Sequence, residues 1–206
     1  MIRHADLRRG ALRNLREHGV LMLDGHFDYG NGYHGRVYLN AHRIFRQPSL
    51  IWRLAQDLIE TLPDHIVEQT EVVAGPVMGG ALLAHTIAGL LDGRRKLTHP
   101  PTSFAPLSLD ESGVLVLRPF YQTVVAGKKV LLADDVRNTG ETLEQARRVI
   151  EDAGGVVIAT TEICDRLEAI VDAGVPNFAL AEYKAPDNYP AADCPLCRDG
   201  VPVTKF

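Results

Sequence analysis

Two neighbouring carboxylates, Asp134 and Asp135, come directly after a short apolar run and shortly before a small polar loop. The apolar run, residues 130–133, is typical of a strand that is buried on both faces of a sheet. The loop, residues 138–142, has the sequence Asn-Thr-Gly-Glu-Thr and leads into a helical pattern from Leu143. Carboxylates suit the hydroxyl groups of a ribose, and a helix start offers free backbone N–H groups to a phosphate. The order of these features predicts a sugar-phosphate site with a divalent cation nearby.

The start of that helix and its neighbours also have simpler explanations. Thr142 is the expected N-cap, because Gln145 three residues later would complete a capping box. Taken singly, an acidic pair is often only a turn, and a threonine in this position is often only a cap. Their uninterrupted order favours a ligand site. Two common nucleotide-binding motifs, G-x-x-x-x-G-K-[ST] and G-x-G-x-x-G after a strand, do not occur in the sequence.

The stretch VLLADDVRNTGET, residues 130–142, resembles the phosphoribosyl-pyrophosphate (PRPP) binding motif of type I phosphoribosyltransferases. The resemblance implies that Asp134 and Asp135 are the catalytic-site carboxylates and bind the ribose 2′ and 3′ hydroxyls. It also implies Mg²⁺ as the cofactor, held through PRPP, with the same two carboxylates as candidate ligands. The loop around the 5-phosphate would comprise Asn138, Thr139, Gly140, Glu141 and Thr142. Glu141 stands where the family usually has Gly or Ala, and its charge is compatible with a phosphate only if it points outward.

A second strand-to-helix turn lies earlier in the chain. We expect a strand at residues 72–74 and a helix at 81–91, with a glycine-rich connection between them. Taken alone, such a turn is common in α/β proteins. Beside the first motif it resembles the pyrophosphate loop of the same family, in which backbone N–H groups approach the diphosphate. This loop would comprise Gly75, Pro76, Val77, Met78, Gly79 and Gly80.

Residues 24–44 are rich in glycine, histidine and aromatic residues, and a plain hairpin would explain them. The segment also resembles the N-terminal hood of orotate phosphoribosyltransferases, which encloses the base. That resemblance implies that Tyr38 and Leu39 contact the base. It also places Arg166, just after an expected strand at 156–163, where that family has an arginine that binds the substrate's carboxylate. A surface ion pair with Asp165 is the simpler alternative for Arg166.

Two departures from the family pattern keep alternatives open. Gly30 stands where orotate phosphoribosyltransferases have a substrate-binding lysine, so a purine or another pyrimidine remains an alternative acceptor. An expected hairpin at residues 102–117 matches the family's mobile flap, but it has no Lys or Arg at 103–113, where the family places cations for the diphosphate. Arg118 or the basic cluster at 94–96 could replace them, although a solvated loop also explains that cluster. A PRPP-binding regulatory protein without catalysis is the other alternative.

The three cysteines bear on compartment and on metal binding. An odd number of cysteines in a chain of this size indicates a reducing compartment, so we expect a cytoplasmic protein. Cys194 and Cys197 form a single C-x-x-C. A zinc site would need two further ligands, and Cys164 lies on an expected strand. We therefore expect the pair to be structural and keep metal binding as the alternative.

Composition excludes several other classes of protein. The chain has 22 basic and 26 acidic residues, and this net charge of −4 argues against non-specific nucleic-acid binding. The sequence has no apolar run long enough to span a bilayer, so we expect no membrane association. Its 206 residues, of which 46% are hydrophobic, suffice for one domain with a substantial core.

Alternating strands and helices predict an α/β fold with a parallel sheet. The resemblance implies a type I phosphoribosyltransferase (Rossmann-like) core that forms a single domain over residues 1–206. A small hood would come mainly from residues 1–45, with help from the C-terminal segment. The implied activity is orotate phosphoribosyltransferase-like: PRPP and a nitrogenous base, with orotate favoured, would give orotidine 5′-monophosphate and pyrophosphate. The family also implies a homodimer.

Overall fold

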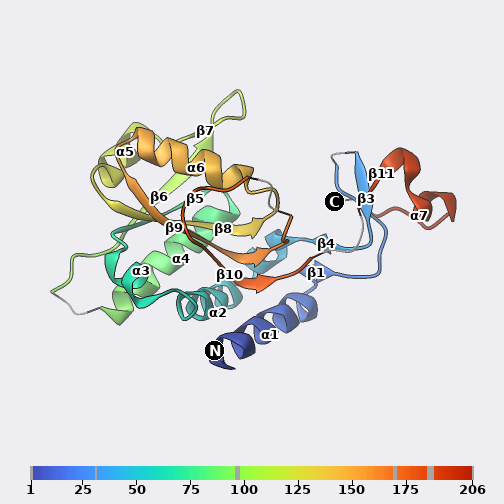
Figure 1. Ribbon diagram of the computed structural model, residues 1–206, viewed down its shortest axis with the longest axis horizontal. Helices are drawn as coiled ribbons and strands as arrows, with labels where there is room; N and C mark the ends of the chain where they lie inside the picture. Colours follow the sequence, from blue (N-terminus) through green and yellow to red (C-terminus); the bar gives the residue numbers. More distant parts are fainter. Residues whose placement is uncertain (1, 31, 96–97, 169–170, 185–187, 206) are drawn as a thin grey trace.

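A six-stranded sheet in the order β10-β9-β8-β5-β6-β7 forms the centre of the molecule (Figure 1). The computed structural model describes residues 2–30, 32–95, 98–168, 171–184 and 188–205. Neighbouring strands are parallel except for the edge pair β6–β7, which is antiparallel. The strands are β5 (Val72–Pro76), β6 (Ser103–Leu109), β7 (Leu115–Val116), β8 (Lys129–Arg137), β9 (Val156–Asp165) and β10 (Asn177–Glu182). The predicted α/β class with a mostly parallel sheet is confirmed.

The apolar run that opens β8 is buried from both sides, as predicted. Val130, Leu131, Leu132 and Ala133 all have zero exposed surface. Leu131 and Ala133 belong to one hydrophobic cluster, and Val130 and Leu132 belong to the other, because successive side chains of a strand point to opposite faces. Fully burying a leucine side chain contributes about 1.5–3 kcal/mol, so this strand anchors both layers of the core.

Helices cover both faces of the sheet (Figure 1). On one face lie the helices of the larger cluster: α1 (Ile2–Glu17), α2 (Pro48–Ile59) and α4 (Gly79–Arg94), with α3 (Asp64–Gln69) beside them. On the other face lie α5 (Pro119–Val125) and α6 (Glu141–Asp152). No helix in the described parts of the chain has the length and apolar character needed to span a bilayer.

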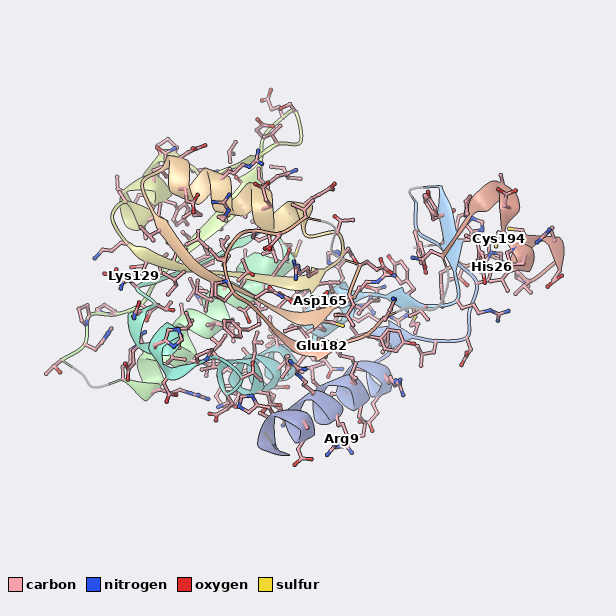
Figure 2. The ribbon with its side chains drawn as sticks, viewed as in Figure 1. Arg9, His26, Lys129, Asp165, Glu182 and Cys194 are labelled. Atoms are coloured by element: carbon pink, nitrogen blue, oxygen red, sulfur yellow. The ribbon has the colours of Figure 1, made fainter. Side chains whose placement is uncertain are left out.

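Short strands from the two ends of the chain form a separate small sheet. Its order is β11-β3-β2, so the C-terminal β11 pairs with the N-terminal β3 in antiparallel fashion. We call this sheet and the short helix α7 the small lobe; it stands beside the main sheet (Figure 1), and His26 and Cys194 lie together in it (Figure 2). Its elements are β2 (Phe27–Asp28), β3 (Tyr33–Gly35), β11 (Asn188–Pro190) and α7 (Pro195–Arg198).

Four further short elements complete the fold, and three of them lie between the small lobe and the core. A two-stranded sheet pairs β1 with β4, in the register Leu21↔Leu39. A 3-10 helix then follows β4 and leads to α2, and a second one joins β11 to α7. These elements are β1 (Leu21–Met22), β4 (Tyr38–Leu39), η1 (Ala41–Arg46) and η2 (Ala191–Asp193).

The strand order creates a switch point between β5 and β8. From β5 the chain proceeds to β6 on one side, whereas β8 lies on the other side of β5. Ligands in open α/β sheets bind at the carboxyl ends of the strands where the order reverses in this way. Both motifs singled out in the sequence, which follow β5 and end β8, therefore meet at one crevice.

A carboxyl group is buried in the sheet next to this crevice. Glu162 on β9 pairs in register with Asp134 on β8 and has zero exposed surface. Its Oε1 accepts a hydrogen bond from Asn177 Nδ2 at 2.8 Å, whereas Oε2 has no hydrogen-bond partner among the described residues. Burial raises the pKa of Glu162 to about 7, although the Asn177 hydrogen bond acts to lower it.

This raised pKa predicts a pH-dependent loss of stability that Glu162→Gln removes. Because the folded pKa exceeds the unfolded value of 4.5, the folded state binds the proton more tightly, and stability falls as pH rises from about 4.5 through about 7. The cost above that range is about 3 kcal/mol at most. Urea unfolding from about pH 5 to about pH 8 should show the variant gaining stability relative to the wild type.

The exposed Glu68→Gln on α3, a residue that does not contribute to the shift of Glu162, is the matched control, and it should track the wild type across the same range. Parallel stability curves for the wild type and Glu162→Gln would contradict the assignment of this proton to Glu162.

Candidate active site

The carboxyl end of β8 buries the two adjacent carboxylates. Asp134 is only 7% exposed, and Asp135 is partly buried. Burial, followed by the charge of Asp135, raises the pKa of Asp134 well above its usual value; burial also raises the pKa of Asp135. Asp134 Oδ1 accepts a bond from the Asp135 N–H at 2.9 Å, and Asp135 Oδ1 accepts one from the Val136 N–H at 2.8 Å. Hydroxyl donors or a cation would relieve the remaining cost of two buried charges.

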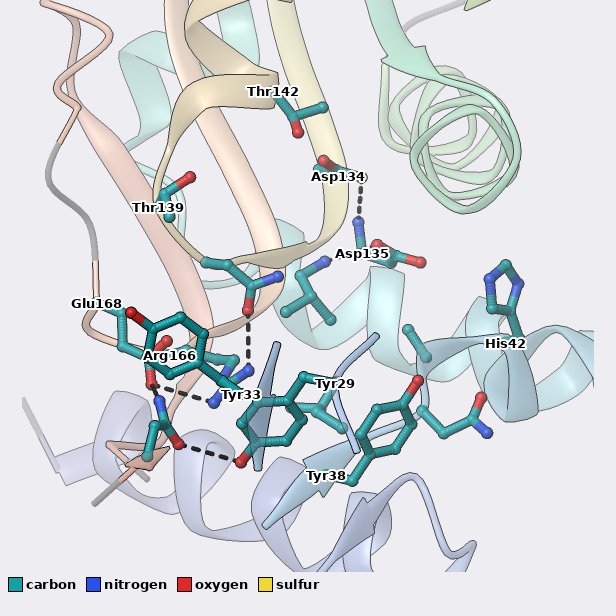
Figure 3. Close-up of a pocket in the computed structure, with 16 residues that line it drawn as sticks. Tyr29, Tyr33, Tyr38, His42, Asp134, Asp135, Thr139, Thr142, Arg166 and Glu168 are labelled. Atoms are coloured by element: carbon teal, nitrogen blue, oxygen red, sulfur yellow. Dashed lines mark hydrogen bonds and ion pairs between the residues drawn. The ribbon is translucent and has the colours of Figure 1, made fainter. Parts of the chain in front are cut away.

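A cavity of about 730 Å³ opens in front of this pair (Figure 3). The structure brings eight of the predicted site residues to its wall, from β4, β8, the following loop, α6 and the segment just after β9. They are Tyr38, Leu39, Asp134, Asp135, Asn138, Thr139, Thr142 and Arg166. A recess of about 100 Å³ is lined by Asp134 and by most of the polar loop, including Gly140.

The helix after the polar loop starts two residues earlier than predicted. Its N-cap is Gly140, with φ +89° and no side-chain capping bond, so the prediction of Thr142 as N-cap is wrong. A Cβ at Gly140 would lie 2.3 Å from the Val171 carbonyl oxygen, and both this contact and the positive φ favour glycine. Thr142 instead lies in the first turn of α6 and lines both the cavity and the recess. Glu141 is exposed and lines neither, as its expected outward orientation requires.

The glycine-rich loop after β5 packs directly against the acidic pair. A Cβ at Gly79 would fall 2.0 Å from Asp135 Oδ2, and one at Gly80 would fall 2.8 Å from Asp134 Oδ1. A Cβ at Gly75 would lie 2.4 Å from the Gly80 carbonyl oxygen and 2.5 Å from the Ala133 carbonyl oxygen. Pro76 is buried, whereas Val77 and Met78 are exposed, and the loop does not contribute to the wall of the cavity. The predicted loop therefore adjoins the carboxylates, with backbone rather than side chains at the contact.

The guanidinium of Arg166 is held at the opposite wall of the cavity (Figure 3). Its Nη2 donates to Glu168 Oε1 at 3.0 Å, and its Nη1 lies 3.4 Å from Asn138 Oδ1. The carbon of the guanidinium lies 5.6 Å from the centre of the Tyr29 ring. Asp165 instead pairs with Arg137 at 3.2 Å, so the alternative of a surface Asp165–Arg166 pair is wrong.

Several residues of the wall were not predicted. Tyr29 donates a hydrogen bond to the Val37 carbonyl oxygen at 2.7 Å, lies 3.1 Å from Asn188 Oδ1 and stacks on Tyr38 with ring centres 6.3 Å apart. Asn188 Nδ2 in turn donates to Glu168 Oε1 at 3.3 Å. The many aromatic residues at 24–44 could have indicated that tyrosines line the site. Asn188 had no such signal, because only the pairing of β11 with β3 brings it to the wall. The other unpredicted residues of the wall are Tyr33, Asn40, Ala41, His42 and Val136.

The structure also shows where the cations considered as replacements in the flap lie. The expected hairpin forms as β6–β7, and its tip at residues 110–114 is held by hydrogen bonds to Asp110. Arg95 donates to the Thr70 carbonyl oxygen and to Thr102, which lie just before β5 and β6 and so at the amino ends of the strands. Arg94 pairs with Glu60, and Lys96 lies outside the described residues. Arg94 and Arg95 are therefore at the wrong end of the sheet. Arg118 lies beyond β7, whose antiparallel course leads away from the tip.

Comparisons with known proteins agree with this geometry. The family model for the phosphoribosyl transferase domain matches residues 40–173. The chain is 33% identical to the orotate phosphoribosyltransferase of Thermotoga maritima, an alignment that covers 94% of this chain and 96% of that protein. The chain therefore belongs to the phosphoribosyltransferase family.

Two solved structures share the fold. The orotate phosphoribosyltransferase of Aeropyrum pernix superposes with a TM-score of 0.66 at 20% identity, over 84% of this chain and 93% of that one. The adenine phosphoribosyltransferase of Thermoanaerobacter pseudethanolicus superposes with a TM-score of 0.55 at 16% identity, over 72% and 90%. Because enzymes named for two different bases share this fold, the fold alone does not select the base.

The close backbone contact behind the acidic pair predicts that Gly75→Ala disrupts the site. The added methyl group would meet two backbone oxygens that cannot rotate away, so the β5 loop must shift. We expect a loss of about 1–3 kcal/mol in unfolding free energy, measured by urea denaturation, and a loss of PRPP binding.

The matched control is Gly89→Ala on the exposed side of α4, where nothing lies within 4 Å of the new Cβ. It should gain about 0.5–1 kcal/mol from helix propensity and leave the site unchanged. Wild-type stability and PRPP affinity in Gly75→Ala would show that the loop is not constrained in this way.

Proposed function

We propose that this chain is an orotate phosphoribosyltransferase, which transfers the 5-phosphoribosyl group of PRPP to orotate and releases pyrophosphate. The observation that carries the proposal is the placing of Arg166 and the acidic pair on facing walls of one cavity. Orotate differs from the other common bases in its carboxylate, and a guanidinium is the side chain best suited to bind a carboxylate. The similarity to the Thermotoga maritima enzyme supports the same choice.

The proposed PRPP site extends along the carboxyl ends of β8 and β5. Asp134 and Asp135 would accept hydrogen bonds from the ribose 2′ and 3′ hydroxyls. The polar loop, residues 138–142, would surround the 5-phosphate with backbone N–H groups at the start of α6. The loop at residues 75–80 would place its backbone N–H groups around the diphosphate, without side chains in the way.

The proposed base site lies toward β4 and the small lobe. Tyr38 and Leu39 line that end of the cavity, and Tyr29 stacks on Tyr38 to extend its aromatic surface. Arg166 is paired there with Glu168, a bond that an incoming carboxylate would replace. A planar base would thus be held by its ring faces and by its carboxylate.

Mg²⁺ fits the donor set of the site. Asp134 and Asp135 supply carboxylate oxygens, which Mg²⁺ prefers, at a place where burial disfavours two uncompensated charges. The ion would be held by the diphosphate and by these carboxylates, and when bound it would neutralise charge on the leaving group.

The chemistry that these residues support needs no covalent nucleophile. As the bond from the ribose to the diphosphate breaks, positive charge develops on the sugar, as in other glycosyl transfers. The carboxylates beside the ribose would stabilise that charge, and the two loops would hold the sugar in line with the base. The main contribution of the protein is therefore orientation and electrostatics.

The chain would act as a single domain in which the small lobe and β4 serve as the hood over the base. The family resemblance supports a homodimer, and the odd number of cysteines supports the cytoplasm as its compartment.

Two rival functions are motivated by specific residues. Gly30 has φ +75° in a turn closed by Asp28, where orotate phosphoribosyltransferases would have a lysine, which favours a different base. The flap tip carries Asp110 and Glu111 but no cation, which favours a PRPP-binding protein without catalysis.

A base panel tests the proposal against both rivals. The purified chain is given PRPP, Mg²⁺ and one base at a time, and pyrophosphate release is measured. We expect turnover with orotate alone. Turnover of adenine or hypoxanthine but not orotate would reverse the choice of base, and PRPP binding without turnover of any base would support the non-catalytic rival.

The variant Arg166→Gln tests the proposed base site in the same assay. Loss of a charge-assisted contact should raise the KM for orotate by roughly 10- to 100-fold and leave the KM for PRPP nearly unchanged. Arg148→Gln on the exposed side of α6 is the matched control, and it should behave as wild type. Equal effects of Arg166→Gln on both substrates would remove Arg166 from the base site.

A further inference from the structure

Four side chains that can bind a metal converge inside the small lobe. They come from two ends of the chain: His26 and His34 from the β2–β3 hairpin, Cys194 from the residue just before α7, and Cys197 from within α7. One donor atom from each lies within 4.8 Å of every other. His26, His34 and Cys194 are at most 8% exposed, and Figure 2 shows His26 and Cys194 together in the lobe, away from the main sheet.

Four of the six separations between the donor atoms are close to the edges of a tetrahedron around one ion, and all six are within 4.8 Å. His26 Nε2 lies 3.0 Å from His34 Nδ1 and 3.5 Å from Cys194 Sγ. Cys197 Sγ lies 3.7 Å from His26 Nε2 and 3.3 Å from His34 Nδ1. Bonds of about 2.0–2.1 Å to nitrogen and about 2.3 Å to sulfur give tetrahedral edges of roughly 3.3–3.8 Å. A small adjustment would bring all four atoms to bonding distance from a common centre.

The hydrogen bonding of His26 orients its ring for this role. Its Nδ1 lies 2.8 Å from the Val201 carbonyl oxygen, which can only accept, so Nδ1 carries the proton. The Nε2 lone pair is then directed at the cluster. Metal-binding histidines usually donate their second ring N–H to a carbonyl or carboxylate in this way.

We propose that His26, His34, Cys194 and Cys197 bind a structural Zn²⁺ ion. Two thiolates and two imidazoles in a tetrahedral arrangement are the ligands that zinc prefers. The protein supplies all four positions, which is typical of structural rather than catalytic zinc. None of the four residues lines the cavity, so this site is distinct from the PRPP site. The two histidines of the hairpin thus provide the further ligands that a zinc site at the C-x-x-C needs.

The described residues of the small lobe form no core that could stabilise it alone. Phe27 and Leu196 are buried in it, but neither belongs to the two hydrophobic clusters of the main domain. A sheet this small buries too little apolar surface to be stable without a disulfide or a metal. The Cys194 and Cys197 thiols are free. Zinc would instead join the C-terminal segment to the hairpin across 168 residues of sequence.

The ion would also support the wall of the active site. Tyr29 and Tyr33 lie within or beside the hairpin, and Asn188 begins β11, the strand that pairs with it. Zinc would hold these elements together and so fix the position of that wall.

Metal analysis of the full-length chain, produced without a polyhistidine tag, tests the proposal. Inductively coupled plasma mass spectrometry should find one zinc ion per chain. Chemical modification of the thiols should release the ion to a colorimetric chelator. Replacement by cobalt(II) should give the absorption bands of a tetrahedral thiolate site.

Cys197→Ser and His34→Gln should lose the bound ion. Cys164→Ala, at the third cysteine, and His65→Gln, an exposed histidine on α3, are matched controls that should keep it. PRPP binding by calorimetry reports independently on the main domain, so failure of the zinc site and failure of the proposed function are distinguishable.

The proposal is overturned if the wild type binds no zinc after purification and after reconstitution under reducing conditions. Full zinc occupancy in the Cys197→Ser, His34→Gln double variant would also overturn it. So would a Cys194–Cys197 disulfide in the reduced preparation, seen as a mass lower by two hydrogens.

Discussion

The burial of two adjacent carboxylates at the end of β8 is the constraint on which the rest of the site depends. Asp134 and Asp135 lose hydration there, and their pKa values rise because nothing among the described residues neutralises them fully. Such an arrangement is costly in the free protein and favours a ligand that brings hydroxyl groups and a cation. The glycine-rich loop meets these carboxylates with backbone rather than charged side chains, which suits the negatively charged diphosphate proposed to bind there.

The order of the strands brings these parts together. Because β8 and β6 lie on opposite sides of β5, the carboxyl ends of β5 and β8 are neighbours, and the glycine-rich loop can pack on the carboxylates. The base site needs a different contribution, since β4 and the small lobe approach the same cavity from the two ends of the chain. In the proposed function the core would therefore position the sugar phosphate, and the small lobe would complete the wall around the base.

Local sequence patterns predicted the parts of the site that are continuous in the chain. The run of four apolar residues became a strand buried on both faces, and the acidic pair and polar loop lie where the motif put them. The N-cap at Thr142 was wrong because Gly140 adopts a positive φ, which begins the helix earlier. Asn188 could not be predicted, since the pairing of β11 with β3 brings it to the wall. The histidine partners of Cys194 could not be predicted either, because His26 lies 168 residues away in the sequence and only the fold brings the two together.

Titration calorimetry of PRPP with Mg²⁺ into wild type and Asp135→Asn tests the central claim most directly. The account predicts that the variant keeps its fold, seen in an unchanged circular dichroism spectrum, and binds PRPP roughly 10- to 100-fold more weakly because a charged acceptor of the ribose hydroxyls is lost. Asp152→Asn, at the exposed end of α6, should bind as the wild type does. Equal PRPP affinity in Asp135→Asn and the wild type would contradict the account.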